Sequence, residues 1–376
     1  MLGLFKKIAP FFTGPAPYLF LSASRKIGPN DTCLFSIYDP SLDEVSNVEI
    51  PLHLAHSVVG NAQSRRRAIA VEQYGSKMCE VDLVDKRVSR LIEAGKGRAF
   101  YGHGTFSADA KLFFSTEIST DEKEEGFLVV RDGATLAELD ILPTYGRRPH
   151  DIALVENGTM LFVANQGAAH TEPNGELTSL VFIDLASGKL VRKMEDSRAG
   201  FLFSHLATNK LGHMAAALFH PQPKQDPESI KIRKLLDNPE TRAEGVKRTI
   251  ETIEYRSAPL FFVGADLREH APESAYAEMR MTLSLCMHSE KPVLGAIHVM
   301  SGLVTFSDAS TNTLLHAEKI DEVPQGIALT EDGKAFVVST MSDSLFYFDA
   351  GNFRLMKRIR PRGFQFGHHL LAWKTA

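Results

Sequence analysis

The sequence predicts an all-β fold, a seven-bladed β-propeller closed by its C-terminal strand, with a small helical insertion in blade four. Three observations predict it. A short strand phrase that ends on aspartate occurs seven times, a hairpin phrase precedes it, and the C-terminal segment resembles the one strand that the N-terminal unit lacks. Self-similar units of roughly 40–50 residues with several short strands each are typical of propellers.

The first element, residues 1–16, is interpreted as an N-terminal arm. Lys6 and Lys7 resemble the start of a signal peptide, but the apolar run that follows is short and is broken by Pro10. A secretory signal needs a longer apolar region. We therefore expect residues 17–376 to form a single propeller domain.

The repeated strand phrase is a run of alternating apolar residues that closes on aspartate and a turn. This alternation is the pattern of a half-buried strand, and the carboxylate can accept backbone N–H groups in the turn. The seven aspartates are Asp39, Asp82, Asp132, Asp184, Asp266, Asp308 and Asp349.

The second phrase is a hairpin that begins each unit. PHDIALVENGTMLFVAN (residues 149–165) aligns without a gap with PQGIALTEDGKAFVVST (residues 324–340), and YGHGTFSADAKLFFSTE (residues 101–117) has the same form. Asn-Gly or Asp-Gly between two strands is a strong hairpin signal. The C-terminal strand, about residues 366–373, is expected to complete the N-terminal blade and to leave no free sheet edge.

The fourth unit is longer than the others because it contains an insertion at about residues 221–256. Ile230, Leu235, Val246 and Ile250 follow helical spacing there. The insertion is either a decoration of the blade, a lid, or a docking surface for a protein partner. The last of these makes a protein–protein interaction scaffold an alternative function.

Histidine is concentrated at one position, the start of the first strand of each unit. Since first strands are innermost in a propeller, we expect these side chains to line one mouth of the central channel. The candidates are His56, His103, His150, His205 and His368, with Met281 and Gln325 at the same position in the other two units. Glu117, Asn165 and Arg148 are expected at the same face and complete the candidate ligand-binding set.

Two interpretations of the histidines stay open at this stage. Imidazoles favour iron, copper or zinc, so three or four of the five could bind a metal, while protonated rings could bind a small anionic ligand. Alternatively the histidines cap strand starts by bonding to neighbouring carbonyl groups. An enzyme, a hydrolase or oxidoreductase with His103 or His150 as a base or ligand, is a third function class, but no catalytic motif supports it.

Composition excludes other classes. A net charge of −4 argues against nucleic acid as a partner, and no apolar run is long enough for a transmembrane segment. Cys33, Cys79 and Cys286 lack metal-ligand spacing and predict free thiols rather than a disulfide framework.

The phrases around Tyr101–Glu117, Pro149–Gly167 and His205 resemble domain-of-unknown-function family 1513 of bacteria. The resemblance covers about residues 54–349. It implies a WD40-like seven-bladed propeller, often exported through a twin-arginine signal and encoded beside iron-uptake components. The positions that it carries over are Tyr101, Gly102, His103, Glu117, Pro149, His150, Asn165 and His205.

The family implies no established reaction, and this chain departs from its pattern at Gln166-Gly167 and in the insertion. Location is left with two answers: periplasmic by the resemblance, and cytoplasmic by the lack of a clear signal peptide.

Overall fold

The computed structural model describes residues 18–26, 32–61, 64–168, 175–197, 201–219, 231, 260–264, 269–270, 279–365 and 367–374. Within them the fold is all-β. The strands form six sheets, each with antiparallel neighbours. Two single turns of 3₁₀ helix, η1 (Glu156–Gly158) and η2 (Val299–Ser301), interrupt two of the hairpins.

The first two sheets are built from the N-terminal half of the chain and the C-terminal strand. The first has the order β28 (Leu371–Lys374), β1 (Tyr18–Lys26), β2 (Thr32–Asp39), β3 (Glu44–Ile50). The second has eight strands, which are β4 (Ala55–Gly60), β5 (Arg67–Gly75), β6 (Lys77–Asp82), β7 (Arg87–Glu93), β8 (Arg98–Phe106), β9 (Leu112–Ser119), β10 (Glu125–Asp132) and β11 (Glu138–Arg147).

The remaining four sheets each contain four strands that are consecutive in the chain. The third contains β12 (Pro149–Val155), β13 (Met160–Asn165), β14 (Thr178–Asp184) and β15 (Leu190–Asp196). The fourth contains β16 (Leu202–Thr208), β17 (Met214–Phe219), β18 (Leu260–Val263) and β19 (Glu269–His270). The fifth contains β20 (Thr282–Met287), β21 (Val293–His298), β22 (Leu303–Asp308) and β23 (Thr313–Lys319). The sixth contains β24 (Pro324–Leu329), β25 (Ala335–Thr340), β26 (Leu345–Asp349) and β27 (Leu355–Ile359).

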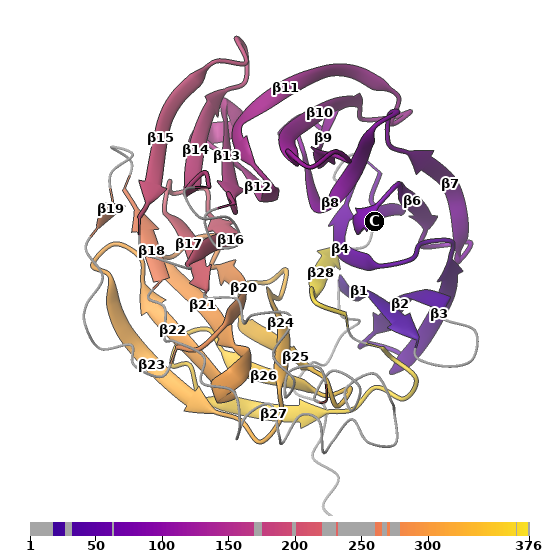
Figure 1. The fold of residues 1–376 in the computed structure, drawn as a ribbon. Helices are drawn as coiled ribbons and strands as arrows, with labels where there is room; N and C mark the ends of the chain where they lie inside the picture. Colours follow the sequence, from indigo (N-terminus) through magenta and orange to yellow (C-terminus); the bar gives the residue numbers. More distant parts are fainter. Residues whose placement is uncertain are drawn as a thin grey trace, which may run out of the picture.

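The sheets stand side by side around a common centre (Figure 1). Strands β4, β8, β12, β16, β20, β24 and β28 lie nearest to the centre, and β3, β7, β11, β15, β23 and β27 lie on the outside. Burial follows this arrangement. Middle strands such as β25 are buried along their whole length, whereas the outer strand β27 is exposed at almost every residue.

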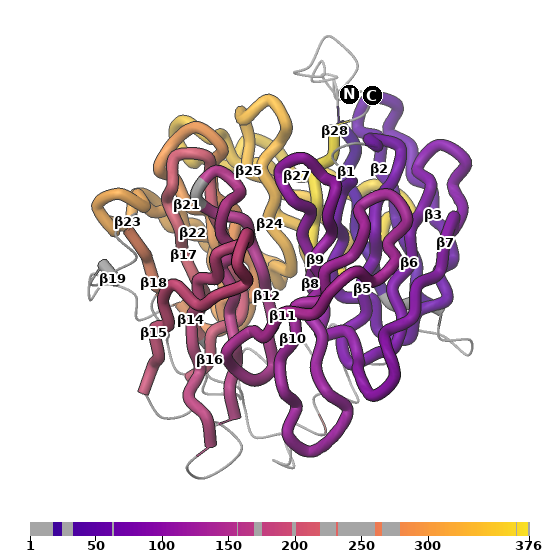
Figure 2. The backbone as a smooth tube through the Cα atoms, turned by 90° about the horizontal axis from the view of Figure 1, so that it is seen from above, coloured from indigo at the N-terminus to yellow at the C-terminus, as the bar shows by residue number. Residues whose placement is uncertain are grey.

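The predicted fold class is wrong as stated. The sequence predicts seven separate blades, but the strands form six sheets, because β5 continues beyond its own hairpin and pairs with β8 at Gln73↔Tyr101 and Gly75↔Phe100. No sheet closes on itself, since the first sheet begins at β28 and ends at β3. β28 pairs with β1 in antiparallel register, and Figure 2 shows the two strands beside each other.

The predicted helical insertion is not seen. Apart from Lys231, residues 221–256 lie outside the described residues, as do residues 1–17 of the predicted arm. No helix in the described part of the chain is long and apolar enough to cross a membrane. The division into residues 1–16 and 17–376 stays a prediction.

The apolar core fills the spaces between neighbouring sheets rather than one central volume. Between the third and fourth sheets, Phe162 and Phe182 stack with their ring centroids 4.6 Å apart and belong to one cluster with Phe203 and Phe261. Successive side chains of a strand point to opposite faces, so the continuous apolar runs of middle strands such as β13 and β25 bury both faces, which explains the many phenylalanines.

The repeated aspartates cap turns, as the sequence predicts. Asp39 Oδ1 accepts the Ser41 amide at 2.8 Å, and equivalent bonds form at Asp82, Asp132, Asp184, Asp308 and Asp349. Asp266 lies outside the described residues. Cys33, Cys79 and Cys286 form no disulfide.

Candidate metal centre

Each innermost strand that carries a predicted histidine has a break in its pairing register at that histidine. In β4, Ala55 pairs with Glu72 and Ser57 with Val71, so His56 is the extra, unpaired residue. His150 is the extra residue of β12 in the same way. The breaks in β8 and β16 include His103 and His205. A β-bulge turns its extra side chain away from the regular alternation, which is how these imidazoles reach the centre.

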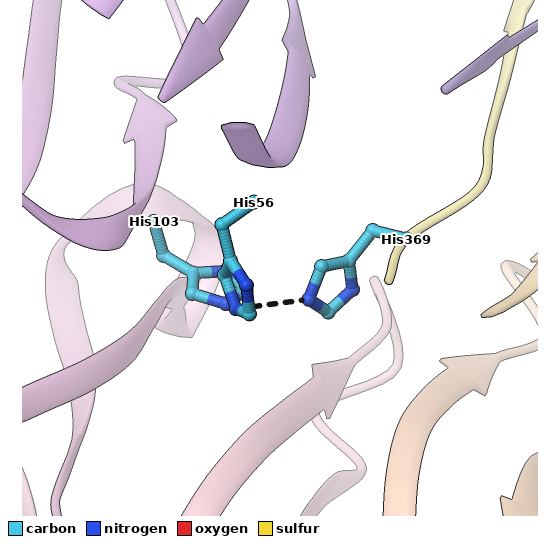
Figure 3. A group of neighbouring side chains, drawn as sticks. All are labelled: His56, His103 and His369. Carbon is cyan, nitrogen blue, oxygen red and sulfur yellow. Dashed lines mark hydrogen bonds between the residues drawn. The ribbon is translucent and has the colours of Figure 1, made fainter. Parts of the chain in front are cut away.

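The imidazoles of His56, His103, His150, His205, His368 and His369 form one group, here called the histidine cluster. His103 is its middle member. The ring centroid of His103 lies 4.9 Å from that of His56, 5.0 Å from His150, 5.4 Å from His205 and 4.8 Å from His369. His368 contacts the cluster through His56, with ring centroids 5.4 Å apart. Figure 3 shows how His56, His103 and His369 converge from separate segments.

Four members of the cluster are buried: His56, His103, His150 and His205 are each less than 8% exposed. His369 is half-buried and His368 is exposed. Burial lowers the pKa of His56 and His205 well below 6.5, and the neighbouring histidines lower it further. Burial also lowers the pKa of His150, to about 3. These rings are therefore neutral at pH 7, the form in which imidazole binds metals.

Within the cluster, three buried ring nitrogens have no hydrogen-bond partner in the described part of the chain. These are Nδ1 of His56, Nε2 of His103 and Nδ1 of His205. Leaving a buried polar atom unsatisfied costs about 1–3 kcal/mol, so such atoms call for an explanation. The buried His298, which lies outside the cluster, has a partner for both nitrogens: Nδ1 and Nε2 lie 2.8 Å and 2.9 Å from the hydroxyls of Thr282 and Thr305.

A carboxylate, Asp151, lies against the cluster. Its Oδ1 is 3.1 Å from Nδ1 of His103, its Oδ2 is 3.9 Å from Nδ1 of His205, and the Leu206 amide donates to it at 2.8 Å. Burial raises the pKa of Asp151, but the interactions with His103, the Leu206 amide and His150 outweigh it and hold the pKa below 3.8. The carboxylate is therefore ionised at pH 7.

Gly102 allows His56 to approach. Its φ is +114°, and a Cβ atom there would lie 2.7 Å from Cδ2 of His56. We expect Gly102→Ala to lower the free energy of unfolding by about 1–3 kcal/mol through backbone strain, and further through the clash. Gly97→Ala is the matched control, because Gly97 has φ +77° and open space around it. Equal losses in urea unfolding for both variants would show that contact with His56 is unimportant.

The other predicted ligand-binding residues do not join the cluster. Glu117 is buried and paired with Arg98 and Arg131. Asn165 donates to the Thr144 carbonyl at 3.0 Å, and Arg148 pairs with Glu124. Gln325, the extra residue of the β24 bulge, donates to its neighbour, the Pro324 carbonyl. In β20 the extra residue of the bulge is Leu283 rather than Met281. Leu283 therefore stands where β4 and β12 carry a histidine.

Sequence reasoning missed two members of the site. His369 follows His368, and Asp151 follows His150, so regular alternation would turn one residue of each pair away. The doubled His in GHHLL and the acidic residue in PHDIA were the available signals. Gln73 also contacts the cluster, since its Nε2 lies 3.4 Å from Nδ1 of His150.

A cavity of about 350 Å³ adjoins the cluster. Its lining includes His103, Asp151, His205 and His369 of the site, together with Leu370 and Trp373. Its size is at the lower end for small-molecule sites. The arrangement offers two groups of three nitrogen ligands, His56 with His103 and His369, and His103 with His150 and His205; the ligand atoms of each group lie within 4.8 Å of one another.

Comparison with known proteins gives a family and a fold. The model of the family described as "Protein of unknown function (DUF1513)" matches residues 52–252. No curated protein matches the chain. Among solved structures, hydrazine synthase of Kuenenia stuttgartiensis is similar with a TM-score of 0.60 and 13% sequence identity, over 93% of this chain and 100% of that one. At this identity the likeness concerns the fold alone.

Proposed function

Since the chain belongs to the DUF1513 family, whose description assigns no reaction, we propose a function from the site itself: the protein binds a transition-metal ion in the histidine cluster. The observation that carries the proposal is the convergence of buried imidazoles, three of which have a buried ring nitrogen without a hydrogen-bond partner among the described residues. A metal ion satisfies such nitrogens with bonds of roughly 2 Å.

Ligand spacing supports the proposal. Nε2 of His56 and Nε2 of His369 lie 3.4 Å apart. Two nitrogens bound to one tetrahedral ion with bonds of 2.0–2.1 Å are separated by about 3.3 Å. The same two atoms can share a proton instead, but a hydrogen bond between them leaves Nε2 of His103 and Nδ1 of His56 unsatisfied.

The donor set favours iron, copper or zinc. Neutral imidazole nitrogens suit these ions, whereas calcium and magnesium require mostly oxygen ligands. The alternative in which the histidines merely cap strand starts requires a partner for each ring nitrogen. His298 meets that requirement, and the cluster does not. The link to iron uptake stays a prediction.

Metal analysis tests the proposal. Protein purified without an affinity tag is stripped with chelator, loaded separately with Fe(II), Cu(II) and Zn(II), and freed of excess ion. We expect at least one tightly held ion per chain for one of the three metals, and a loss of at least ten-fold in bound metal in the double variant His103→Ala, His150→Ala.

The control variant is His288→Gln. His288 is buried, but Nε2 lies 3.1 Å from the Gly333 carbonyl and Nδ1 accepts the Glu290 amide at 3.1 Å, so it has no nitrogen to offer. Its metal content is expected to equal that of the wild type. Near-zero metal in the folded wild-type protein with all three ions would overturn the proposal.

A further inference from the structure

The histidine cluster divides into two ligand groups that share one residue. Group A is His56, His103 and His369, and group B is His103, His150 and His205. Across the two groups, the ring centroids of His56 and His205 are 6.4 Å apart, while those of His56 and His150 are 5.2 Å apart and those of His205 and His369 are 4.8 Å apart, so the two groups adjoin each other. A tetrahedral ion takes four ligands, so one such ion cannot bind all five imidazoles of the two groups.

His103, the residue that both groups share, directs its Nδ1 towards Asp151 in group B's part of the cluster. Nδ1 of His103 faces Asp151 at 3.1 Å, and the other oxygen of the same carboxylate faces Nδ1 of His205 at 3.9 Å. Nδ1 of His205 has no hydrogen-bond partner among the described residues. An ionised carboxylate and two imidazole nitrogens this close together form a set of three ligand atoms for one cation.

The other ring nitrogen of His103 remains for group A. Nε2 of His103 is buried and lacks a hydrogen-bond partner within the described part of the chain. In group A, Nε2 of His56 and Nε2 of His369 already have the separation expected of two ligands on one tetrahedral ion. Figure 3 shows the rings of His56 and His103 side by side, facing His369.

From these placements we propose that the cluster is a two-metal centre in which His103 bridges the ions. Nε2 of His103 binds the first ion with His56 and His369, and Nδ1 binds the second with Asp151, His205 and His150. The second ion replaces the proton on Nδ1, which passes to solvent and leaves His103 as an imidazolate. This inference rests on the proposed metal-binding function and adds the number of ions, their ligands and the bridge.

The charge of the site suits this arrangement. The imidazolate and Asp151 together carry two negative charges, which offset half of the charge of two divalent ions. The remaining charge faces the cavity lined by His103, Asp151, His205 and His369, where water or a small anion has room to bind. A buried dication without anionic ligands would have a much larger desolvation penalty.

The experiment is a titration of metal-free protein with Cu(II), followed by electron paramagnetic resonance, with Zn(II) stoichiometry measured in parallel. We expect two ions per chain with either metal. Two Cu(II) ions joined by an imidazolate couple antiferromagnetically, so the integrated signal per copper at low temperature should fall as the second equivalent binds.

Three single variants separate the two groups. We expect His369→Ala, which disrupts group A, and His205→Ala and Asp151→Asn, which disrupt group B, each to bind one Cu(II) with a full, uncoupled signal. His288→Gln should keep two coupled ions. Two ions per wild-type chain with additive signals would overturn the bridge, and one ion with both metals would overturn the two-metal centre while leaving the proposed function intact. No bound ion with iron, copper or zinc would overturn the proposed function itself.

Discussion

Replacing Glu117 by glutamine is expected to lower the free energy of unfolding by about 3–5 kcal/mol, the usual range when one partner of a buried ion pair is removed. Glu117 is fully buried. One carboxylate oxygen lies 2.9 Å from Nε of Arg98 and the other 2.8 Å from Nη2 of Arg131. Glutamine has nearly the same volume as glutamate, so the lost stability measures the cost of leaving the charge of Arg131 unpaired. Arg131 is itself only 2% exposed.

Glu138→Gln is the matched control for this prediction. Glu138 pairs with the same Arg98, but its side chain is 36% exposed. We expect a loss of at most about 1 kcal/mol, as for surface ion pairs. Urea unfolding of metal-free protein measures both variants. Losses of equal size would contradict the buried-network explanation. An unchanged stability together with a lowered metal content in Glu117→Gln would support the sequence-based prediction that Glu117 binds a ligand.

The position of Glu117 illustrates what the repeat pattern can and cannot predict. Alignment of the units places Glu117 at the end of a second strand, and it does lie at the end region of β9. Whether such a side chain faces the centre or the neighbouring strand depends on the side of the sheet and on local partners. Arg98 and Arg131 come from β8 and β10, which flank β9, and they hold the carboxylate within the sheet.

The histidines were more predictable because one residue type recurs at one repeat position. The repeat places His56, His103, His150 and His205 on innermost strands, where the structure brings them together. Asp151 and His369 were not predicted, because each adjoins another site residue and strict alternation would separate the two. The register break at His150 places that ring and Asp151 at the same site, and no residue-type pattern marks such a bulge.

The sheet count was missed for a related reason. A repeat shows which strands follow one another within a unit, but not how far a strand continues. β5 runs on to Gly75, and its last residues pair with the first half of β8. One such extension joins two expected blades into a single eight-stranded sheet.

Acid is expected to destabilise the metal-free protein, beginning near pH 6.5. The folded-state pKa of His56, His150, His205 and His369 is lowered by burial and then by neighbouring histidines. Below pH 6.5 the unfolded chain therefore binds protons that the folded chain does not, and stability falls as the pH falls. The loss continues down to the folded-state pKa, which is about 3 for His150.

The size of the effect can be bounded with His150. Its ring faces Asp151, which favours the protonated form, and His103 and His368, which oppose it. Each pH unit between the unfolded and folded pKa values removes about 1.4 kcal/mol, so His150 alone contributes a loss of about 2 kcal/mol at pH 5. Asp151 does not hide the effect of His150 on stability. The pKa of Asp151 lies below 3.8, so its own contribution to stability changes only at a lower pH.

Thermal or urea unfolding between pH 7.5 and 5 measures the slope. His150→Gln removes one of the titrating rings and is expected to reduce the pH dependence by about 2 kcal/mol over this range. Metal-loaded wild-type protein should be more stable at pH 7.5, by about 4 kcal/mol when free metal is a thousand times the dissociation constant. Because protons and metal compete for the same nitrogens, that advantage should shrink towards pH 5. A metal-free protein whose stability is flat from pH 7.5 to 5, or a His150→Gln slope equal to that of the wild type, would contradict the burial of neutral imidazoles from which both proposals start.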